Sequence, residues 1–307
     1  MSDEREPRLE ALADGAYAWV QPDGTWWVNN AGAVVTDAGI LIVDTCATEW
    51  RTRAFLAALE QVSDSPITVA VNTHLHGDHT YGNSLLPPAT AIIGHENTRA
   101  GILADPVIDG CPPFWAPVPD WGAVVRRPPT LTTSTSLTVH LGDRRIEVEH
   151  PGHPAHTAGD LVVWLPDVRV LFVGDLLFHR VTPLVFMGSV DGALRALDWI
   201  ATFEPDLVVP GHGPLIGPAE LPDVLETHRN YYNLVLDTAR RARRDGLTPL
   251  AAARNCELGA FADQPDAERI VLNLHRARAD DLAVEMNLME ALADAVTFNG
   301  GPMHTSV

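Results

Sequence analysis

The run THLHGDHT at residues 73–80 constrains the fold more than any other part of the chain. It places three imidazoles and one carboxylate within six residues, and both groups are common ligands of zinc and related metals. Burying so dense a polar cluster is costly unless something binds it. The apolar segment before it, residues 67–72, is typical of a buried strand. The sequence therefore predicts a metal-binding loop at the end of a strand, displayed by a rigid scaffold.

Three later segments carry further potential ligands at the ends of predicted strands. The run HPGHPAHTAGD at residues 150–160 precedes an apolar strand, FVGD ends a strand at Asp175, and VPGH ends another at His212. Glycines in these segments let the backbone turn sharply beside the ligand. Together with the first run they supply five histidines and two aspartates, enough for two metal ions that share a bridging carboxylate.

The composition fits a globular enzyme. A chain of 307 residues with 46% hydrophobic residues suits one large domain, or one domain with an appendage. No stretch approaches 18 uninterrupted apolar residues, so we expect no membrane span. The charged start lacks the apolar centre of a secretory signal, and three scattered cysteines do not form a disulfide framework. We therefore expect a cytoplasmic protein.

The net charge of −19 argues against nucleic acid or an anionic membrane surface as the main partner. Two basic clusters stand out, Arg126-Arg127 and the four arginines within residues 240–244. Each is typical of a solvated face, and each is also a candidate surface for an acidic partner.

The order of predicted elements favours an α/β fold. Two β-rich regions, residues 17–45 and 131–175, are each followed by helical spacing, which predicts a four-layer α/β/β/α sandwich. A proline-rich segment at 104–130 is long enough to be a functional lid or binding loop. Helical stripes at 224–244 and 267–296 follow the last strand. We expect a catalytic domain over 1–218 and a helical extension over 219–307 packed on it.

The separated motifs match a known family in order. The pattern His74-x-His76-x-Asp78-His79, followed by three further ligands, resembles the metallo-β-lactamase superfamily over roughly residues 15–215. The resemblance implies the αββα metallo-β-lactamase sandwich and two Zn²⁺ ions, with iron or manganese as open alternatives. It implies one metal held by His74, His76 and His156, a second held by Asp78, His79 and His212, and Asp175 as the bridge. True β-lactamases commonly have cysteine at the Asp175 position, so the chain resembles the binuclear hydrolase branch instead.

The same resemblance assigns supporting roles. Family spacing fits His156 as the third-segment ligand better than His153, which we expect to lie, with Thr157, just behind the ligands. Asp44 matches a family position that orients the histidine loop by hydrogen bonds. His179, four residues past Asp175, is a candidate acid/base, with a surface position as the alternative.

Two adjacent divalent ions suit acyl transfer. They lower the pKa of a bound water to about 7 and polarise a carbonyl oxygen, which suits hydrolysis of thioesters, lactones or esters, and also aldol chemistry. Asp78 and His179 are the candidate proton acceptors. Five aromatic side chains could build a wide apolar pocket for a flat substrate, or could simply pack loops: Trp26, Trp27, Phe114, Trp115 and Trp121.

Segments outside the metal motif resemble a narrower group, the metallo-β-lactamase-like cyclases of aromatic (type II) polyketide pathways, actinorhodin second-ring cyclase type. They are residues 71–83, 160–166, 181–189, 273–277 and 299–301. This resemblance implies a dizinc polyketide cyclase/thioesterase that closes a ring by aldol condensation and dehydration. The substrate would be an aromatic polyketide bound to an acyl carrier protein and released by thioester hydrolysis, with the arginine clusters as candidate docks. A homodimer remains open.

Two alternatives remain. A generic dizinc hydrolase of small thioesters or lactones, glyoxalase II-like or a lactonase, would be favoured by a basic cleft and disfavoured by a roomy aromatic pocket. An iron-dependent oxidoreductase uses a similar ligand set and would be recognised by its metal content.

Overall fold

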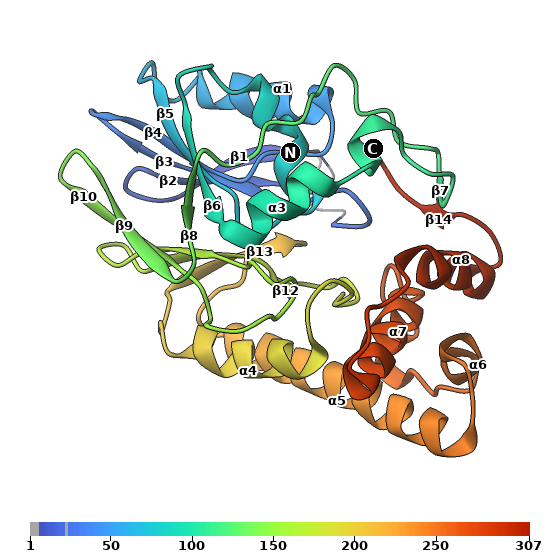
Figure 1. The fold of residues 1–307 in the computed structure, drawn as a ribbon. Helices are drawn as coiled ribbons and strands as arrows, with labels where there is room; N and C mark the ends of the chain where they lie inside the picture. The colour runs from blue at the N-terminus through green and yellow to red at the C-terminus, as the bar shows by residue number, and fades with distance from the viewer. Residues whose placement is uncertain (1–5, 22–23) are drawn as a thin grey trace.

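A computed structural model describes residues 6–21 and 24–307, so the first part of the charged start lies outside the described residues. Two sheets form the centre of the molecule (Figure 1). The first sheet, in spatial order, consists of β1 (Arg8–Ala13), β2 (Ala16–Val20), β3 (Ala31–Thr36), β4 (Gly39–Val43), β5 (Ile67–Val71), β6 (Ala91–His95) and β8 (Leu131–Thr133). The second consists of β13 (Leu207–His212), β12 (Val170–Phe178), β11 (Val162–Leu165), β10 (Arg144–Glu149) and β9 (Ser136–Leu141).

Strand direction places the polar run at one edge of the first sheet. Strands β4, β5, β6 and β8 are parallel neighbours, so their carboxyl ends meet at the same edge. In the second sheet β12 and β13 are likewise parallel, whereas the other pairs are antiparallel. The inner faces of the two sheets share one apolar core, in which Val34 and Leu41 of the first sheet belong with Val163 and Phe172 of the second.

Helices cover the outer faces and complete the four layers. Helix α1 (Glu49–Leu59) packs Phe55 and Leu59 against the first sheet. Helix α4 (Val190–Ala201) buries Leu197 and Ile200 against the second sheet, and the Ser189 side chain caps it by accepting from the Gly192 amide. The predicted four-layer α/β architecture is therefore confirmed.

Short elements connect the layers around one end of the sheets. They are α2 (Gly77–Thr80), η1 (Tyr81–Leu85), α3 (Glu96–Ala104), η2 (Val107–Asp109) and the two-stranded pair of β7 (Trp115–Ala116) with β14 (Met303–His304). The last pair joins the predicted proline-rich loop to the C-terminus (Figure 1).

The C-terminal helices run from the layer below the second sheet to one side of the sheets (Figure 1). They are α5 (Leu221–Asp245), α6 (Pro249–Arg254), η3 (Gly259–Phe261), α7 (Arg269–Leu282) and α8 (Leu288–Asn299). Tyr232 of α5 and Leu274 of α7 belong to the same buried cluster as Val173 of β12, so these helices share a core with the sheet. The expected boundary at residue 218 remains a prediction.

The helical stripe over 267–296 is interrupted. Ala283 adopts a left-handed conformation (φ 52°), and its amide bonds the carbonyl oxygens of Ala279 and Asp280, which ends α7. Asn287 then caps α8 by accepting from the Glu290 amide. The prediction of one continuous helix was wrong because the apolar spacing continues across the break. None of the described helices is both long and apolar enough to cross a membrane.

Candidate metal centre

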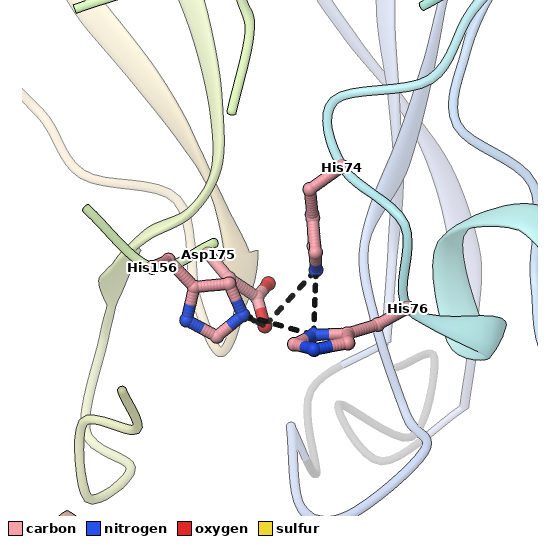
Figure 2. A group of neighbouring side chains, drawn as sticks. All are labelled: His74, His76, His156 and Asp175. Carbon is pink, nitrogen blue, oxygen red and sulfur yellow. Dashed lines mark hydrogen bonds and ion pairs between the residues drawn. The ribbon is translucent and has the colours of Figure 1, made fainter. Parts of the chain in front are cut away.

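The polar run and the three later segments converge between the two sheets. Residues 74–79 follow β5 and enter α2, so they come from the carboxyl edge of the first sheet. His156 precedes β11, Asp175 lies within β12, and His212 ends β13, all from the second sheet. Figure 2 shows His74 and His76 reaching across to His156 and Asp175 from the opposite side. Parallel pairing of β12 with β13 brings the last two segments together.

The first donor group comprises His74, His76, His156 and Asp175, whose ligand atoms all lie within 4.8 Å of one another (Figure 2). Nδ1 of His76 is 2.9 Å from Nε2 of His156 and 3.0 Å from Nε2 of His74. Oδ2 of Asp175 is 3.3 Å from Nε2 of His156. Three imidazoles and a carboxylate oxygen thus face a common point.

The second donor group comprises Asp78, His79 and His212. Oδ2 of Asp78 is 3.2 Å from Nε2 of His212 and 3.7 Å from Nε2 of His79. Asp175 lies between the two groups, because its Oδ1 is 3.1 Å from Nε2 of His79 and its Oδ2 is 3.4 Å from Nε2 of His212. The structure thus brings the predicted residues together in two groups with Asp175 between them, and their roles as ligands and bridge stay a prediction.

These residues fit a pair of metal ions. Nε2 of His79 and Oδ1 of Asp175 are buried and lie 3.1 Å apart, and neither makes a hydrogen bond of suitable geometry within the described part of the chain. A buried polar atom without a hydrogen bond lowers the stability of the folded protein. A divalent cation between the groups would satisfy them, since imidazole nitrogens and carboxylate oxygens are suitable ligands.

Glycine is required beside the bridge. Gly174 has a positive φ of 52°, and a Cβ there would lie 2.5 Å from Oγ1 of Thr73. A Cβ on Gly211 would lie 1.9 Å from Oδ1 of Asp175. Gly174 therefore lets β12 approach Thr73 closely, and Gly211 lets β13 approach Asp175 closely.

Asp44 supports the histidine loop, as expected. Its carboxylate accepts from the Thr73 amide (2.7 Å), from Thr73 Oγ1 (2.6 Å) and from Nδ1 of His79 (2.8 Å). Thr73 Oγ1 in turn lies 3.0 Å from Nδ1 of His74. One buried carboxylate thereby fixes a donor of each group with its Nε2 facing the site.

Two other donors are held by main-chain carbonyl groups. Nδ1 of His156 donates to the Leu184 oxygen (2.7 Å), and Nδ1 of His212 donates to the Gly24 oxygen (3.0 Å). Such contacts on the far nitrogen set the tautomer and orientation of a ligating imidazole.

The pKa values of the donor histidines differ according to how close each imidazole lies to a carboxylate. Burial lowers the pKa of His76 to about 3. Burial also lowers the pKa of His212, but the carboxylates of Asp175 and Asp78 outweigh it and raise that pKa to about 9. The same balance holds the pKa of His79 well above its usual value. Protons therefore compete with metal ions mainly at the second group.

We expect metal loading to release about two protons per chain at pH 7, one each from His79 and His212. Affinity should fall as the pH falls, and its dependence on His212 should disappear as the pH rises through about 9. Titration calorimetry of the chelator-treated protein, in two buffers with different ionisation enthalpies, measures this release. Equal heats in both buffers would contradict the expectation.

A cavity of about 290 Å³ opens beside the donors. Four donor residues, His76, Asp78, Asp175 and His212, contribute to its lining. The rest is mainly apolar and aromatic, including Trp26, Trp27, Leu75, Tyr81, Val107, Trp115, Phe178, Leu184, Phe186, Met187, Leu288, Met289 and Leu292. The two donor groups thus face an apolar chamber.

Three of the five predicted pocket aromatics, Trp26, Trp27 and Trp115, belong to this lining. Phe114 and Trp121 lie behind it. The ring centroid of Phe114 is 6.2 Å from that of Trp115, and that of Trp121 is 4.7 Å from that of Trp27. These two side chains therefore support the lining.

Three other predicted residues lie away from the cavity. Nδ1 of His179 contacts the Pro214 carbonyl oxygen at 3.0 Å, which gives its ring a main-chain contact and no support as an acid/base. His153 contacts the Pro154 oxygen at 3.1 Å. Thr157 donates to the Asp160 carboxylate at 2.7 Å, which shapes the loop that carries His156.

The cavity also contains residues that sequence reasoning missed. Phe186 and Met187 come from an irregular segment without a recognisable pattern, and Leu288 and Leu292 come from α8. Tyr81 lies two residues past His79, and its hydroxyl donates to Asp105 at 2.6 Å. Only its closeness to the polar run could have suggested it.

Arg127 is used within the fold. Its guanidinium donates to the carbonyl oxygens of Leu86 (2.7 Å) and Thr90 (3.0 Å), among others. Its neighbour Arg126 donates to the Asp105 carbonyl oxygen and pairs with Asp109 at 2.9 Å. These contacts fix the loop beside η1, so the Arg126-Arg127 pair is better explained as loop support than as a docking surface.

Curated relatives share the sequence only in part. The chain is 28% identical over 219 residues to the 2,4-dinitroanisole O-demethylase subunit alpha of a Nocardioides species, covering 68% of this chain and 59% of that one. It is 25% identical to the linear primary-alkylsulfatase of a Pseudomonas species, covering 69% and 46%, and 26% identical to a metallo-beta-lactamase type 2 of a Bacillus species, covering 60% and 66%. The chain thus spans about half to two thirds of the length of these relatives.

Solved structures share the fold. A metallo-beta-lactamase from Pontibacter korlensis superposes with a TM-score of 0.60 at 20% identity, covering 73% of this chain and all (100%) of that one. The DIM-1 metallo-beta-lactamase superposes with a TM-score of 0.56 at 19% identity, covering 74% and 97%. The profile of the metallo-beta-lactamase superfamily matches residues 24–212, a range that contains every donor of both groups. The chain therefore belongs to the metallo-beta-lactamase superfamily.

Proposed function

We propose that this protein is a dizinc enzyme that acts on a hydrophobic, aromatic acyl substrate, with polyketide cyclase/thioesterase as its specific activity. One observation carries the proposal: two donor groups able to hold metal open directly onto an apolar, aromatic cavity. Pockets that bind organic ligands combine such a lining with a few placed polar groups.

The charge of the lining favours this proposal over a glyoxalase II-like enzyme. Arg269 is the one lysine or arginine among the described residues that line the cavity, and it is only 1% exposed. Its guanidinium pairs with Asp266 at 2.6 Å and donates to the Thr182 carbonyl oxygen at 2.9 Å. A basic cleft for an anionic glutathione-like group therefore has no counterpart in this lining.

Two relatives point in the same direction by their names, since one acts on 2,4-dinitroanisole and the other on linear primary alkyl sulfates. Both substrates carry a hydrophobic organic group. Asp175 in place of the cysteine common in true β-lactamases argues against lactam hydrolysis.

The reaction divides between the metal pair and the chain. Two zinc ions at the donor groups would supply a water of lowered pKa and polarise the substrate carbonyl. Asp78, whose carboxylate lines the cavity, would hold a proton taken from water or from a substrate carbon. Trp26, Trp27 and Trp115 would exclude water and fix the plane of an aromatic substrate.

The proposed substrate would arrive on an acyl carrier protein. Of the two arginine clusters, the group at residues 240–244 remains the candidate dock, since Arg240 and Arg243 are exposed on α5. Both pair with neighbouring aspartates, Asp237 and Asp281, which an acidic partner would have to displace. We expect this contact to weaken with salt.

The test is a substrate comparison with metal analysis. The purified protein should contain two zinc ions per chain and convert aryl polyketide thioesters with a kcat/KM at least about 100-fold above that for lactoylglutathione, because about 3 kcal/mol of apolar contact separates the two. Efficient hydrolysis of lactoylglutathione with inert aryl thioesters would favour the generic hydrolase. Two irons and no zinc would favour the oxidoreductase.

A cavity-filling variant shows whether the substrate occupies this chamber. Leu292→Trp adds bulk from α8 and should lower kcat/KM for the aryl thioester at least tenfold, by about 1.4 kcal/mol or more, with zinc content unchanged. Val62→Trp, at an exposed site after α1, is the matched control and should have no effect.

A further inference from the structure

His76 is oriented differently from the other donors. Nε2 of the other four donor histidines faces the site and Nδ1 is held from behind. His76 presents Nδ1 to the site, 2.9 Å from Nε2 of His156, and turns Nε2 outward. The outward nitrogen lies 3.3 Å from Sδ of Met187. The far side of this imidazole is therefore met by a thioether, not by a carboxylate or a carbonyl group.

Two consecutive residues enclose the His76 ring. Phe186 stacks on its face, with centroids 4.8 Å apart and ring planes within 9°. Met187 approaches its edge, and the thioether sulfur is a weak acceptor for the Nε2 proton. The stack alone is compatible with a half-turn of the ring about Cβ–Cγ, which would replace Nδ1 by Cδ2 at the site. The sulfur contact with Nε2 is made in only one of these two orientations.

The segment that carries these residues is anchored by α7. Asn273 accepts from the Val185 amide at 2.6 Å and donates to the Pro183 oxygen at 2.9 Å. The same segment supplies Leu184, whose carbonyl oxygen accepts from Nδ1 of His156. Residues 183–187 therefore connect a C-terminal helix to two donors of the first group.

We infer that Met187 is a positioning residue for metal binding: its thioether accepts a hydrogen bond from Nε2 of His76 and keeps Nδ1 turned toward the first donor group. The inference rests on the proposed metal centre and is independent of the substrate. Met187 is 38% exposed, so its side chain can be replaced without opening the core.

The test measures zinc affinity of the full chain by competition with a chromophoric chelator. Met187→Leu keeps the apolar volume and removes the acceptor, so one of the two zinc ions should bind about tenfold more weakly. Met289→Leu is the matched control, because Met289 also lines the cavity and is 57% exposed, yet its sulfur makes no hydrogen bond with a donor histidine among the described residues. Its zinc affinities should match those of the unchanged protein.

A second variant separates positioning from packing. Met187→Gln offers an amide oxygen at similar reach and should restore the affinity lost in Met187→Leu. In the unchanged zinc protein, nitrogen NMR of labelled histidines should show the proton of His76 on Nε2, with a shift of that signal in Met187→Leu.

Several results would overturn the inference. They are unchanged zinc affinity in Met187→Leu, a glutamine variant as weak as the leucine variant, and a His76 proton on Nδ1. If the unchanged protein binds no zinc, the proposed function fails as well, whereas two tightly bound zinc ions with an inert Met187→Leu would contradict the Met187 role alone.

Discussion

Asp175→Asn should abolish binding of two metal ions and lower kcat/KM by about 10³-fold or more, equivalent to about 4 kcal/mol of transition-state stabilisation. The reason is its position between the groups, with Oδ1 near His79 and Oδ2 near His156 and His212. An amide keeps the shape but loses the negative charge and one acceptor oxygen. Metal analysis of the purified variant, alongside kinetics with the aryl thioester, measures both effects.

A carboxylate paired with histidine elsewhere provides the control. Asp294 of α8 accepts from Nε2 of His275 at 2.9 Å, away from both donor groups. Asp294→Asn should retain two metal ions per chain. Full metal content in Asp175→Asn would refute the bridging role.

Asp44→Asn should destabilise the protein by about 2–3 kcal/mol and weaken metal binding by about 10–100-fold. Asp44 is buried and accepts three hydrogen bonds, from the amide and hydroxyl of Thr73 and from His79. Its φ is 59°, a conformation that asparagine tolerates, so the variant tests the carboxylate and not the backbone. One amide oxygen cannot replace both carboxylate oxygens, and the amide nitrogen of the variant would face an N–H or O–H group that itself donates a hydrogen bond.

Denaturant unfolding of the metal-free protein and chelator competition measure the two effects separately. Asp37→Asn, at an exposed turn, controls for the loss of one negative charge and should change neither quantity. Weaker metal binding with unchanged stability would mean that Asp44 acts only through His79. Unchanged binding would contradict its positioning role.

The predictions for the sheets succeeded where the pattern was local. Residues 39–43 and 67–71 are mainly apolar runs, and both form central, mutually parallel strands. Within the β-rich region expected over residues 17–45, Trp26–Val28 forms no strand: of these residues, only Trp26 makes an isolated bridge, to Thr305. That position depends on the C-terminus, 279 residues away, which no local pattern can show.

The lining of the cavity was predicted only in part, because it too is formed by segments that are distant in the sequence. Trp26 and Trp115 are conspicuous in the sequence, and their centroids lie 5.5 Å apart in the structure. Leu288 and Leu292 look like ordinary apolar positions of an amphipathic helix. Whether such a position faces a core or a cavity depends on what α8 packs against.

The sequence by itself determined the donor set and its order along the chain, because metal ligands must be specific residue types and here lie in short runs at strand ends. The tertiary structure alone decided which imidazole nitrogen faces the site, how Asp175 lies between the groups, and what lines the chamber. Those features arise from contacts between distant segments, such as Met187 with His76 and β14 with β7 at Trp115. Their energies depend on distance in space, which residue spacing does not encode.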